Sequence, residues 1–238
     1  MLREIGQLES IFRYPVKSMA GERLDTATLG WHGIDGDRRL AFLRVDDRSG
    51  MPWLTASRLP ELLRYVPQKN GGSIPTHIRT PSGQDLPIFS DELAAEITRR
   101  CGAPVQMMQL RHGIFDETAI SVIAVDTIRE IGRMAGRTLD VRQFRPNILV
   151  RATDPVPFQE DQWIGGVLSF GPTDDAPAVT VTRRDERCGM VNLHPDSAEA
   201  APEIMKAIVQ ANQNMAGIYA TVKRPGQLAV GQSIYLHS

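Results

Sequence analysis

A succession of short strand-like segments, separated by glycine- and proline-containing turns, constrains the fold of this chain more than any other feature of its sequence. In the first 90 residues these segments lie at 5–16, 23–29, 39–45, 62–66 and 76–80. Turn sequences such as Asn70-Gly71-Gly72 and Pro81-Ser82-Gly83 separate them. Glycine and proline interrupt regular structure at such positions. Many short strands with this punctuation are typical of barrels and sandwiches.

The rest of the chain adds further strands and a few helices. Helices are predicted after Ser90 and Asp126, both expected N-caps, and after Pro202, which suits a first helical turn. Strand-like segments lie at 105–110, 120–125, 141–150, 167–170, 178–182, 218–222, 227–230 and 233–236. We therefore predict an α+β, predominantly β fold with a barrel and about three helices. A polar link at 111–117 places a domain boundary between 1–110 and 111–238.

The composition excludes several functional classes. The net charge of the 238 residues is −1, so the overall charge does not indicate a nucleic-acid partner or an acidic lipid surface. Two cysteines do not make a disulfide framework, and the absence of Cys-x-x-Cys and His-Glu-x-x-His motifs excludes a zinc ribbon and a zincin. No secretory signal and no apolar run of about 18 residues is visible. We expect a cytoplasmic protein without a transmembrane helix.

The stretch 180–196 contains the best candidate for a reactive residue. A strand ends there in three arginines (Arg183, Arg184 and Arg187), directly followed by Cys188. Cationic neighbours favour thiolate, the form that acts as nucleophile or metal ligand. The alternative is a half-buried loop cysteine beside solvated arginines. His194 follows and could act as a base, although a loop position suits it as well. The second cysteine, Cys101, falls on the apolar face of the helix after Ser90 and is expected in the core.

Four other residues, in three places along the sequence, could contact an anion. Lys17 and Ser18 follow a strand end and could hold a phosphate, although the glycines of a P-loop are absent and an ordinary surface lysine is the alternative. Arg38 lies in a turn beside Asp37, where it could make a plain ion pair or bind an anionic ligand through its planar fork of donors. Arg145 is held extended by the proline after it, and could bind an anion or pair with a buried carboxylate.

Taken together in order, these motifs resemble the MOSC family, named for the molybdenum cofactor sulfurase C-terminal domain. The motifs are YPVKS near residue 16, GIDGDR about twenty residues later, FRPN, the Arg187-Cys188 pair, and GIYATVKRPGQLAVGQSIYL near the end. They are similar to the subgroup with an N-terminal β-barrel domain, which includes the amidoxime reducing component and its bacterial relatives. The resemblance implies an N-terminal barrel-like domain at 1–110 and a MOSC domain at 111–238.

The resemblance also implies a molybdenum cofactor, a pyranopterin that carries the metal. Cys188 would supply the protein thiolate to molybdenum and be the catalytic residue. Lys17, Ser18, Arg38 and Arg145 would contact the phosphate and the pterin, and Tyr219 would lie nearby. The segment after the cysteine departs from the family pattern, with His194 and Ala198 where aspartate and glycine are frequent, and Gln232 replaces a frequent aspartate. These departures leave the identity of the substrate open.

The implied activity is reduction of N-hydroxylated small molecules. No set of cluster-binding cysteines is present, so the electrons would come from a separate flavin or iron-sulfur protein. Two alternatives remain: a sulfur carrier or sulfurtransferase with a persulfide on Cys188, and a non-catalytic module that binds the cofactor. Neither nucleic acid nor membrane is expected as a partner.

Overall fold

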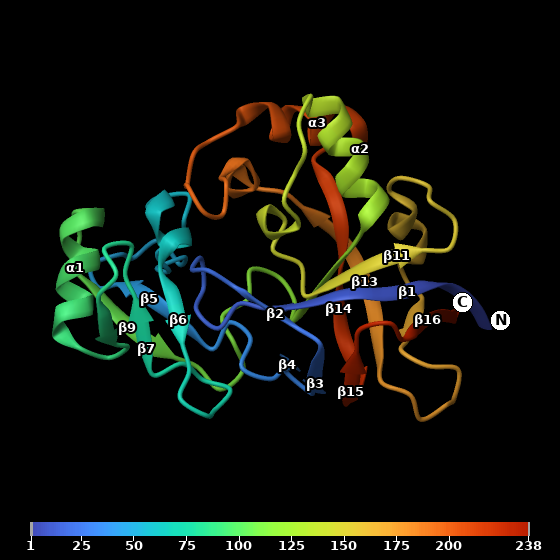
Figure 1. The fold of residues 1–238 in the computed structure, drawn as a ribbon, viewed down its shortest axis with the longest axis horizontal. Helices are drawn as coiled ribbons and strands as arrows, with labels where there is room; N and C mark the ends of the chain where they lie inside the picture. Colours follow the sequence, from blue (N-terminus) through green and yellow to red (C-terminus); the bar gives the residue numbers. More distant parts are fainter. Residues whose placement is uncertain (1, 238) are drawn as a thin grey trace.

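The computed structural model describes residues 2–237 and contains a closed barrel of seven strands (Figure 1). The first strand, β1 (Leu2–Arg13), closes the barrel because it pairs antiparallel with a strand on either side, β16 and β11. Around the barrel the order after β1 is β11 (Ile148–Ala152), β10 (Ile120–Ala124), β14 (Met215–Arg224), β13 (Ala178–Glu186), β12 (Val167–Ser169) and β16 (Ser233–His237).

Inward-facing aliphatic side chains fill the barrel. Leu8, Val122, Val150 and Ile218 belong to one buried cluster, and each comes from a different strand. The pairing of β1 with β16 shifts its register just before Gly6, as at a β-bulge. A Cβ atom at Gly6 would lie 2.3 Å from the carbonyl oxygen of residue 151, so only glycine allows β1 and β11 to approach this closely.

A second lobe stands at the left of Figure 1 and has its own core of residues such as Leu40, Phe42, Leu54 and Ile97. Its helix α1 (Asp91–Cys101) begins at Ser90, whose side chain accepts from the Leu93 N–H, and ends at Gly102 in the left-handed region. Cys101 is half-buried and packs against this core. The strands are β5 (Leu40–Arg44), β9 (Val105–Gln109), β6 (Val66–Gln68), β7 (His77–Arg79) and β8 (Asp85–Pro87).

Two helices, α2 (Val125–Ala135) and α3 (Pro202–Asn212), pack against one another and cover one end of the barrel (Figure 1). Asp126 does not cap α2, because the N-cap position is Ala124 and Asp126 lies within the first turn. Among the residues that the structure describes, no side chain caps the first turn of α2, and the N–H of Ala124 itself donates to the carboxylate of Glu160. Residues 141–143 form a 3-10 turn rather than the start of a strand. The remaining strands are β2 (Glu22–Leu24), β3 (Thr26–Gly30), β4 (Gly33–Ile34) and β15 (Gly226–Ala229).

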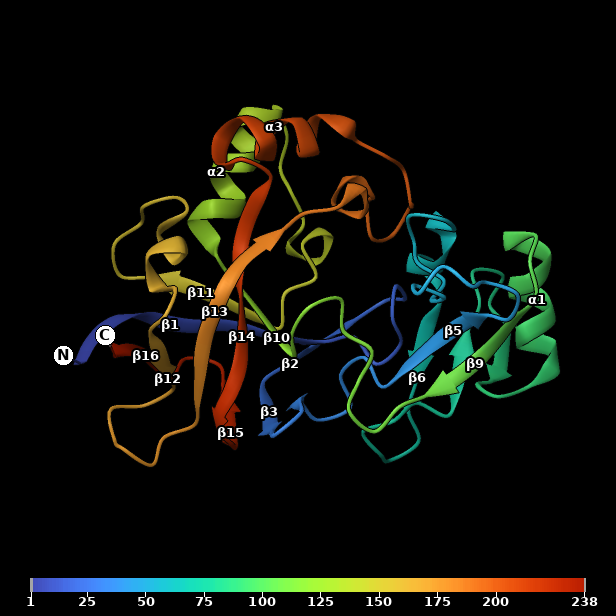
Figure 2. The same ribbon diagram turned by 180° about the vertical axis from the view of Figure 1, so that it is seen from behind.

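The structure confirms the prediction of a predominantly β, α+β fold with a barrel, and residues 2–237 contain three α-helices. The barrel draws its first strand from the N-terminal stretch and its other six from residue 120 onward, with the second lobe between them in the sequence (Figure 2). The division at residue 110 stays a prediction. In the described part of the chain, no helix has the length and apolar character needed to span a membrane.

Candidate functional site

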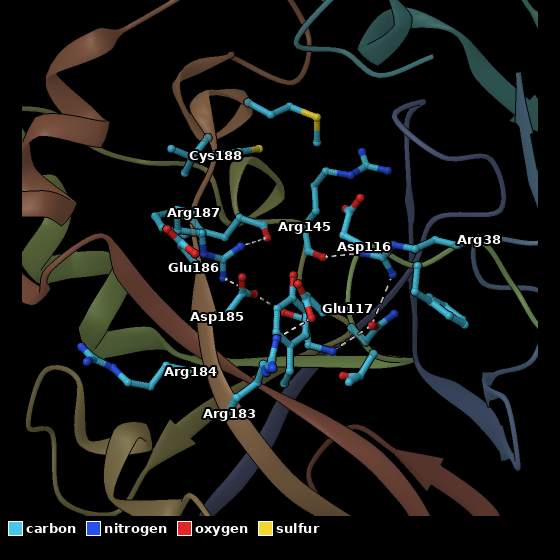
Figure 3. A pocket seen from close by; sticks show the side chains of 18 of the residues that line it. Arg38, Asp116, Glu117, Arg145, Arg183, Arg184, Asp185, Glu186, Arg187 and Cys188 are labelled. Atoms are coloured by element: carbon cyan, nitrogen blue, oxygen red, sulfur yellow. Dashed lines mark hydrogen bonds and ion pairs between the residues drawn. The ribbon is translucent and has the colours of Figure 1, made fainter. Parts of the chain in front are cut away.

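A cleft of about 890 Å³ has walls from both the barrel and the second lobe. Met51 and Thr55 line it from the lobe, and the end of β13 lines it from the barrel. The six residues predicted for the site come from five separate stretches of the sequence, yet all of them line this cleft: Lys17, Ser18, Arg38, Arg145, Cys188 and Tyr219. Figure 3 shows how the labelled residues surround it.

Lys17 and Ser18 lie on the loop that follows β1. The Lys17 side chain is buried, and its Nζ donates to Asp116 Oδ1 at 2.6 Å and to the Ile114 carbonyl at 3.4 Å. Burial lowers the pKa of Lys17, although the Asp116 carboxylate opposes the change. Ser18 Oγ lies 3.8 Å from the sulfur of Met190. The ammonium group is therefore fixed at the cleft wall with one carboxylate beside it.

Arg38 is held by a fully buried carboxylate, Asp37. Oδ1 of Asp37 accepts from the Tyr14 N–H at 2.7 Å, and Oδ2 pairs with Arg38 Nη1 and accepts from Asn147 Nδ2 at 3.0 Å. Arg38 Nη2 donates to the Arg145 carbonyl at 2.9 Å. Burial lowers the pKa of Arg38, but Asp37 outweighs it, so the pKa is raised. The guanidinium therefore belongs to a hydrogen-bonded network within the protein.

Arg145 is buried without a carboxylate partner among the described residues. Its guanidinium stacks on the Tyr14 ring at 4.1 Å, and Nη1 donates to the Met19 carbonyl at 2.7 Å. Nη2 is buried and has no hydrogen-bond partner. Burial, together with the neighbouring Arg38, lowers the pKa of Arg145 to about 10. An N–H group left unpaired in this way suits an acceptor that enters the cleft.

Three of the cleft residues have backbone conformations that L-amino acids rarely adopt. The φ angles are 64° at Ser18, 47° at Arg38 and 50° at Arg145, so the prediction that the following proline holds Arg145 extended is wrong. Each such residue costs about 1–3 kcal/mol, and the strain persists only where the surrounding structure enforces it. Three such residues therefore lie on this one cleft.

Cys188 lies on the opposite wall, two residues after the end of β13, and precedes a 3-10 turn at residues 189–192. Its side chain is exposed, and Figure 3 shows the sulfur directed into the pocket. The other cysteine, Cys101, is on α1 and does not line the cleft. Cys188 therefore presents a thiol to the cleft.

The three arginines before Cys188 have partners of their own. Arg183 pairs with Glu117, and Arg184 pairs with Asp161 at 3.0 Å. In Figure 3 both arginines lie away from Cys188. The expected cluster of positive charge around the thiol is therefore not observed for these two side chains.

Arg187 turns back into the protein. Its Nε donates to the Ala216 carbonyl and its Nη1 to the Phe144 carbonyl, both at 2.7 Å, and Nη2 lies 2.9 Å from Asp185 Oδ2. Arg187 therefore ties the end of β13 to the start of β14 and so positions the residue that follows it, Cys188.

Tyr219 and His194 lie in different surroundings. Tyr219 is on β14 at the cleft, and burial together with Asp185 raises the pKa of its hydroxyl. His194 does not line the cleft. Its Nδ1 accepts from the backbone N–H groups of Asp196 and Ser197 at 3.3 and 3.4 Å. These two hydrogen bonds stabilise the loop, so His194 has the loop position that the sequence allowed rather than a place in the cleft.

Several residues that line the cleft were not predicted from the sequence. Asp116 and Glu117 lie in the segment interpreted as a link, and their exposed carboxylates line the cleft. Ser121 donates to the buried Asp185 at 2.9 Å. No local spacing points to these residues. Asn147 could have been found, because it belongs to the FRPN motif that also contains Arg145.

The donor set fits an anionic cofactor that carries a soft metal. Lys17 and Arg145 supply charged donors of the kind that bind phosphate, and Arg38 adds positive charge beside them. The unpaired Nη2 of Arg145 lacks only an acceptor. Across the cleft, Cys188 offers a sulfur ligand, which suits soft or intermediate metals.

The overall fold resembles known structures. A crystal structure of the YuaD protein from Bacillus subtilis covers 100% of this chain and 99% of its own, with a TM-score of 0.55 and 16% identity. YiiM from Geobacillus stearothermophilus is similar over 50% of this chain and 54% of its own, with a TM-score of 0.39 and 19% identity. The likeness to YuaD, at 16% identity, concerns the fold alone. No curated protein matches the sequence.

Family models cover nearly the whole chain. The model of the MOSC N-terminal beta barrel domain matches residues 5–117, and the model of the MOSC domain matches residues 89–235. The second match covers more than half of the sequence. The chain therefore belongs to the MOSC domain family, which is generally associated with binding of the molybdenum cofactor.

Proposed function

We propose that this protein binds the molybdenum cofactor in the cleft and reduces N-hydroxylated small molecules. The observation that carries the proposal is the convergence of Lys17, Arg38 and Arg145 with the thiol of Cys188 on one cleft. A cofactor with a phosphate at one end and a metal at the other needs such a combination of cations and soft ligand.

The residues divide the binding between them. Lys17 Nζ would donate to phosphate oxygens beside the positive charge of Arg145, and the Arg38 network would keep this wall rigid. Ser18 Oγ and the Tyr219 hydroxyl would contact the pterin or lie beside it. Cys188 would ligate the metal from the opposite wall, on a strand end that Arg187 holds in place.

The bound cofactor would supply two-electron chemistry, and the protein would orient the substrate beside it. Reduction of an N-hydroxyl group breaks the N–O bond, consumes two electrons and two protons, and releases water. The electrons would come from a separate flavin or iron-sulfur protein. The exposed carboxylates of Asp116 and Glu117 would meet the substrate at the mouth of the cleft.

Metal analysis of purified protein tests the assignment. Protein from a host that makes the cofactor should carry close to one molybdenum per chain, and Cys188→Ser should lose most of it. Cys101→Ser is the matched control, because Cys101 does not line the cleft, and it should retain the metal. Full occupancy in Cys188→Ser would refute the role of this thiolate. Retained cofactor without turnover of any N-hydroxylated compound would favour a binding module instead.

Transfer of sulfur is a second candidate, and the exposure of Cys188 favours it. A persulfide on an exposed thiol is accessible to a partner that accepts sulfur. Incubation with a cysteine desulfurase should then add the mass of one sulfur atom to Cys188. Bound molybdenum without such an adduct would favour the reductase.

A further inference from the structure

A second cleft, of about 500 Å³, shares one residue with the first. Arg145 lines both clefts, whereas Tyr14, on which it stacks, lines only the second. The other walls come from the second lobe, including Arg64 and Arg79, and from Arg142 on the barrel side. This cleft contains none of the other five residues predicted for the site.

Two buried polar atoms at this cleft lack partners. The hydroxyl of Tyr14 and Nη2 of Arg145 are both inaccessible, and neither makes a hydrogen bond within the structure. The side chains that carry them are more than nine-tenths buried, with 1% and 8% of their residue surface exposed. Burial of an unpaired polar group costs about 1–3 kcal/mol. Both side chains line the cavity, so an acceptor that enters it is the partner that these two donors lack.

The charges of the second cleft favour an anion. Four arginines line it, with Asp196 as the single carboxylate. Arg142 binds Asp140 and Asp196, and Arg79 pairs with Asp85.

The other two arginines keep their charges uncompensated. Within residues 2–237, Arg64 and Arg145 have no acidic partner within 4.0 Å. Burial raises the pKa of Tyr14 to about 12, so its hydroxyl remains a donor at neutral pH. The cleft therefore offers donors and positive charge but few acceptors.

We propose that the second cleft binds an oxyanion group, a phosphate or a carboxylate, which accepts hydrogen bonds from Tyr14 Oη and Arg145 Nη2, with the positive charge of Arg64 on the same cleft. The proposal goes beyond the proposed function and does not depend on it, since Tyr14 and Arg64 do not line the first cleft. Because Arg145 is common to both clefts, an anion in the second would partly neutralise the guanidinium that faces the first.

Anion titrations of the full chain, at constant ionic strength, test the proposal. Inorganic phosphate and malonate serve as probes of the two oxyanion types. The Lys17→Met background removes a cation from the first cleft and should leave this binding in place. Tyr14→Phe should weaken it at least about ten-fold, because a hydrogen bond to a charged ligand is lost. Tyr65→Phe is the control: its hydroxyl contacts Glu96 outside both clefts, and affinity should not change.

Thermal unfolding provides a second, independent readout. Without added anion, Tyr14→Phe should melt at the same temperature as the wild type or higher, because the variant removes an unpaired buried hydroxyl. Phosphate or malonate should then stabilise the wild type more than Tyr14→Phe.

The proposal is overturned if neither probe binds, or if binding survives Tyr14→Phe but disappears in Lys17→Met, which would place the anion in the first cleft. A clear loss of melting temperature in anion-free Tyr14→Phe would also overturn it, because the hydroxyl would then have a structural partner. The molybdenum content of Cys188→Ser reports on the proposed function separately. The two hypotheses can therefore fail independently.

Discussion

Arg38 and Arg145 form a natural comparison, because they resemble one another in almost every respect except their partners. Their guanidinium groups lie 5.0 and 4.1 Å from the centre of the same ring, that of Tyr14. Both have positive φ angles, 47° and 50°, and both line the first cleft. Arg38 contacts the buried carboxylate of Asp37. Arg145 instead donates to the Met19 carbonyl oxygen through Nη1, and its Nη2 has no hydrogen-bond partner.

The difference separates a structural charge from one kept for a ligand. Asp37 raises the pKa of Arg38 against the effect of burial, while burial lowers the pKa of Arg145 to about 10. A paired buried charge is part of the fold, and removal of its partner is strongly destabilising. A buried charge without a partner costs stability, so we infer that Arg145 is retained for binding.

Removal of Asp37 should have the largest effect on stability. Asp37→Ala would leave the Arg38 guanidinium, the Tyr14 N–H and the Asn147 amide without their shared acceptor. We expect a loss of about 3–5 kcal/mol in the free energy of unfolding, measured with urea. Asp85→Asn is the control, because it breaks an exposed pair with Arg79 and should cost less than about 1 kcal/mol. Equal losses in the two variants would contradict a special role for the Asp37 network.

Replacement of the two arginines by methionine tests the comparison directly in cofactor-free protein. Arg38→Met would leave Asp37 buried without its cation, and we expect a loss of about 2–4 kcal/mol. Arg145→Met removes an uncompensated charge and keeps an apolar chain near Tyr14, so stability should change by less than about 1 kcal/mol. Urea unfolding of both variants measures the difference. Similar losses in the two would show that Arg145 is as structural as Arg38.

Local signals in the sequence predicted the elements that depend on neighbouring residues. Helix α1 is an example, since its cap at Ser90 and its end at Gly102 both follow from residue type and local backbone preference. The same reasoning failed for α2. Its N-cap residue, Ala124, has no capping side chain, and the Ala124 N–H donates to Glu160, 36 residues further along the chain, so no nearby residue type could have revealed where the helix begins.

The site shows the same limit. Motifs identified Lys17, Arg38, Arg145 and Cys188 as candidates, but only the closed barrel and the second lobe bring them to one cleft. For Arg145 the sequence left two possibilities, an anion contact or a buried carboxylate partner. The described structure shows no such carboxylate. Asp116 was missed because its partnership with Lys17 spans 99 residues.

Glu160 extends the comparison of Arg38 with Arg145 to a buried carboxyl group. It has no cationic partner among the described residues, but each of its two oxygens accepts a hydrogen bond. Oε1 accepts from the Ala124 N–H at 3.3 Å and Oε2 from the Thr127 hydroxyl at 2.8 Å. By the criterion that distinguishes Arg38 from Arg145, Glu160 is structural. Burial raises the pKa of its carboxyl above the usual 4.5, against these two hydrogen bonds.

The raised pKa of Glu160 predicts a dependence of stability on pH, which is the smallest of the three predicted effects. Since the folded state holds the Glu160 proton to higher pH than the unfolded chain, the contribution to stability is complete below pH 4.5 and is lost as pH rises through the folded pKa. For one titrating group, the unfolding free energy cannot change by more than about 1.4 kcal/mol per pH unit. Glu160→Gln cannot titrate at this position. The unfolding free energy of the wild type should therefore fall relative to that of the variant as pH rises from 4.5 through the folded pKa, and the difference should be constant at higher pH. Parallel curves would mean that Glu160 stays ionised in the fold, and that donors alone suffice to hold a buried charge.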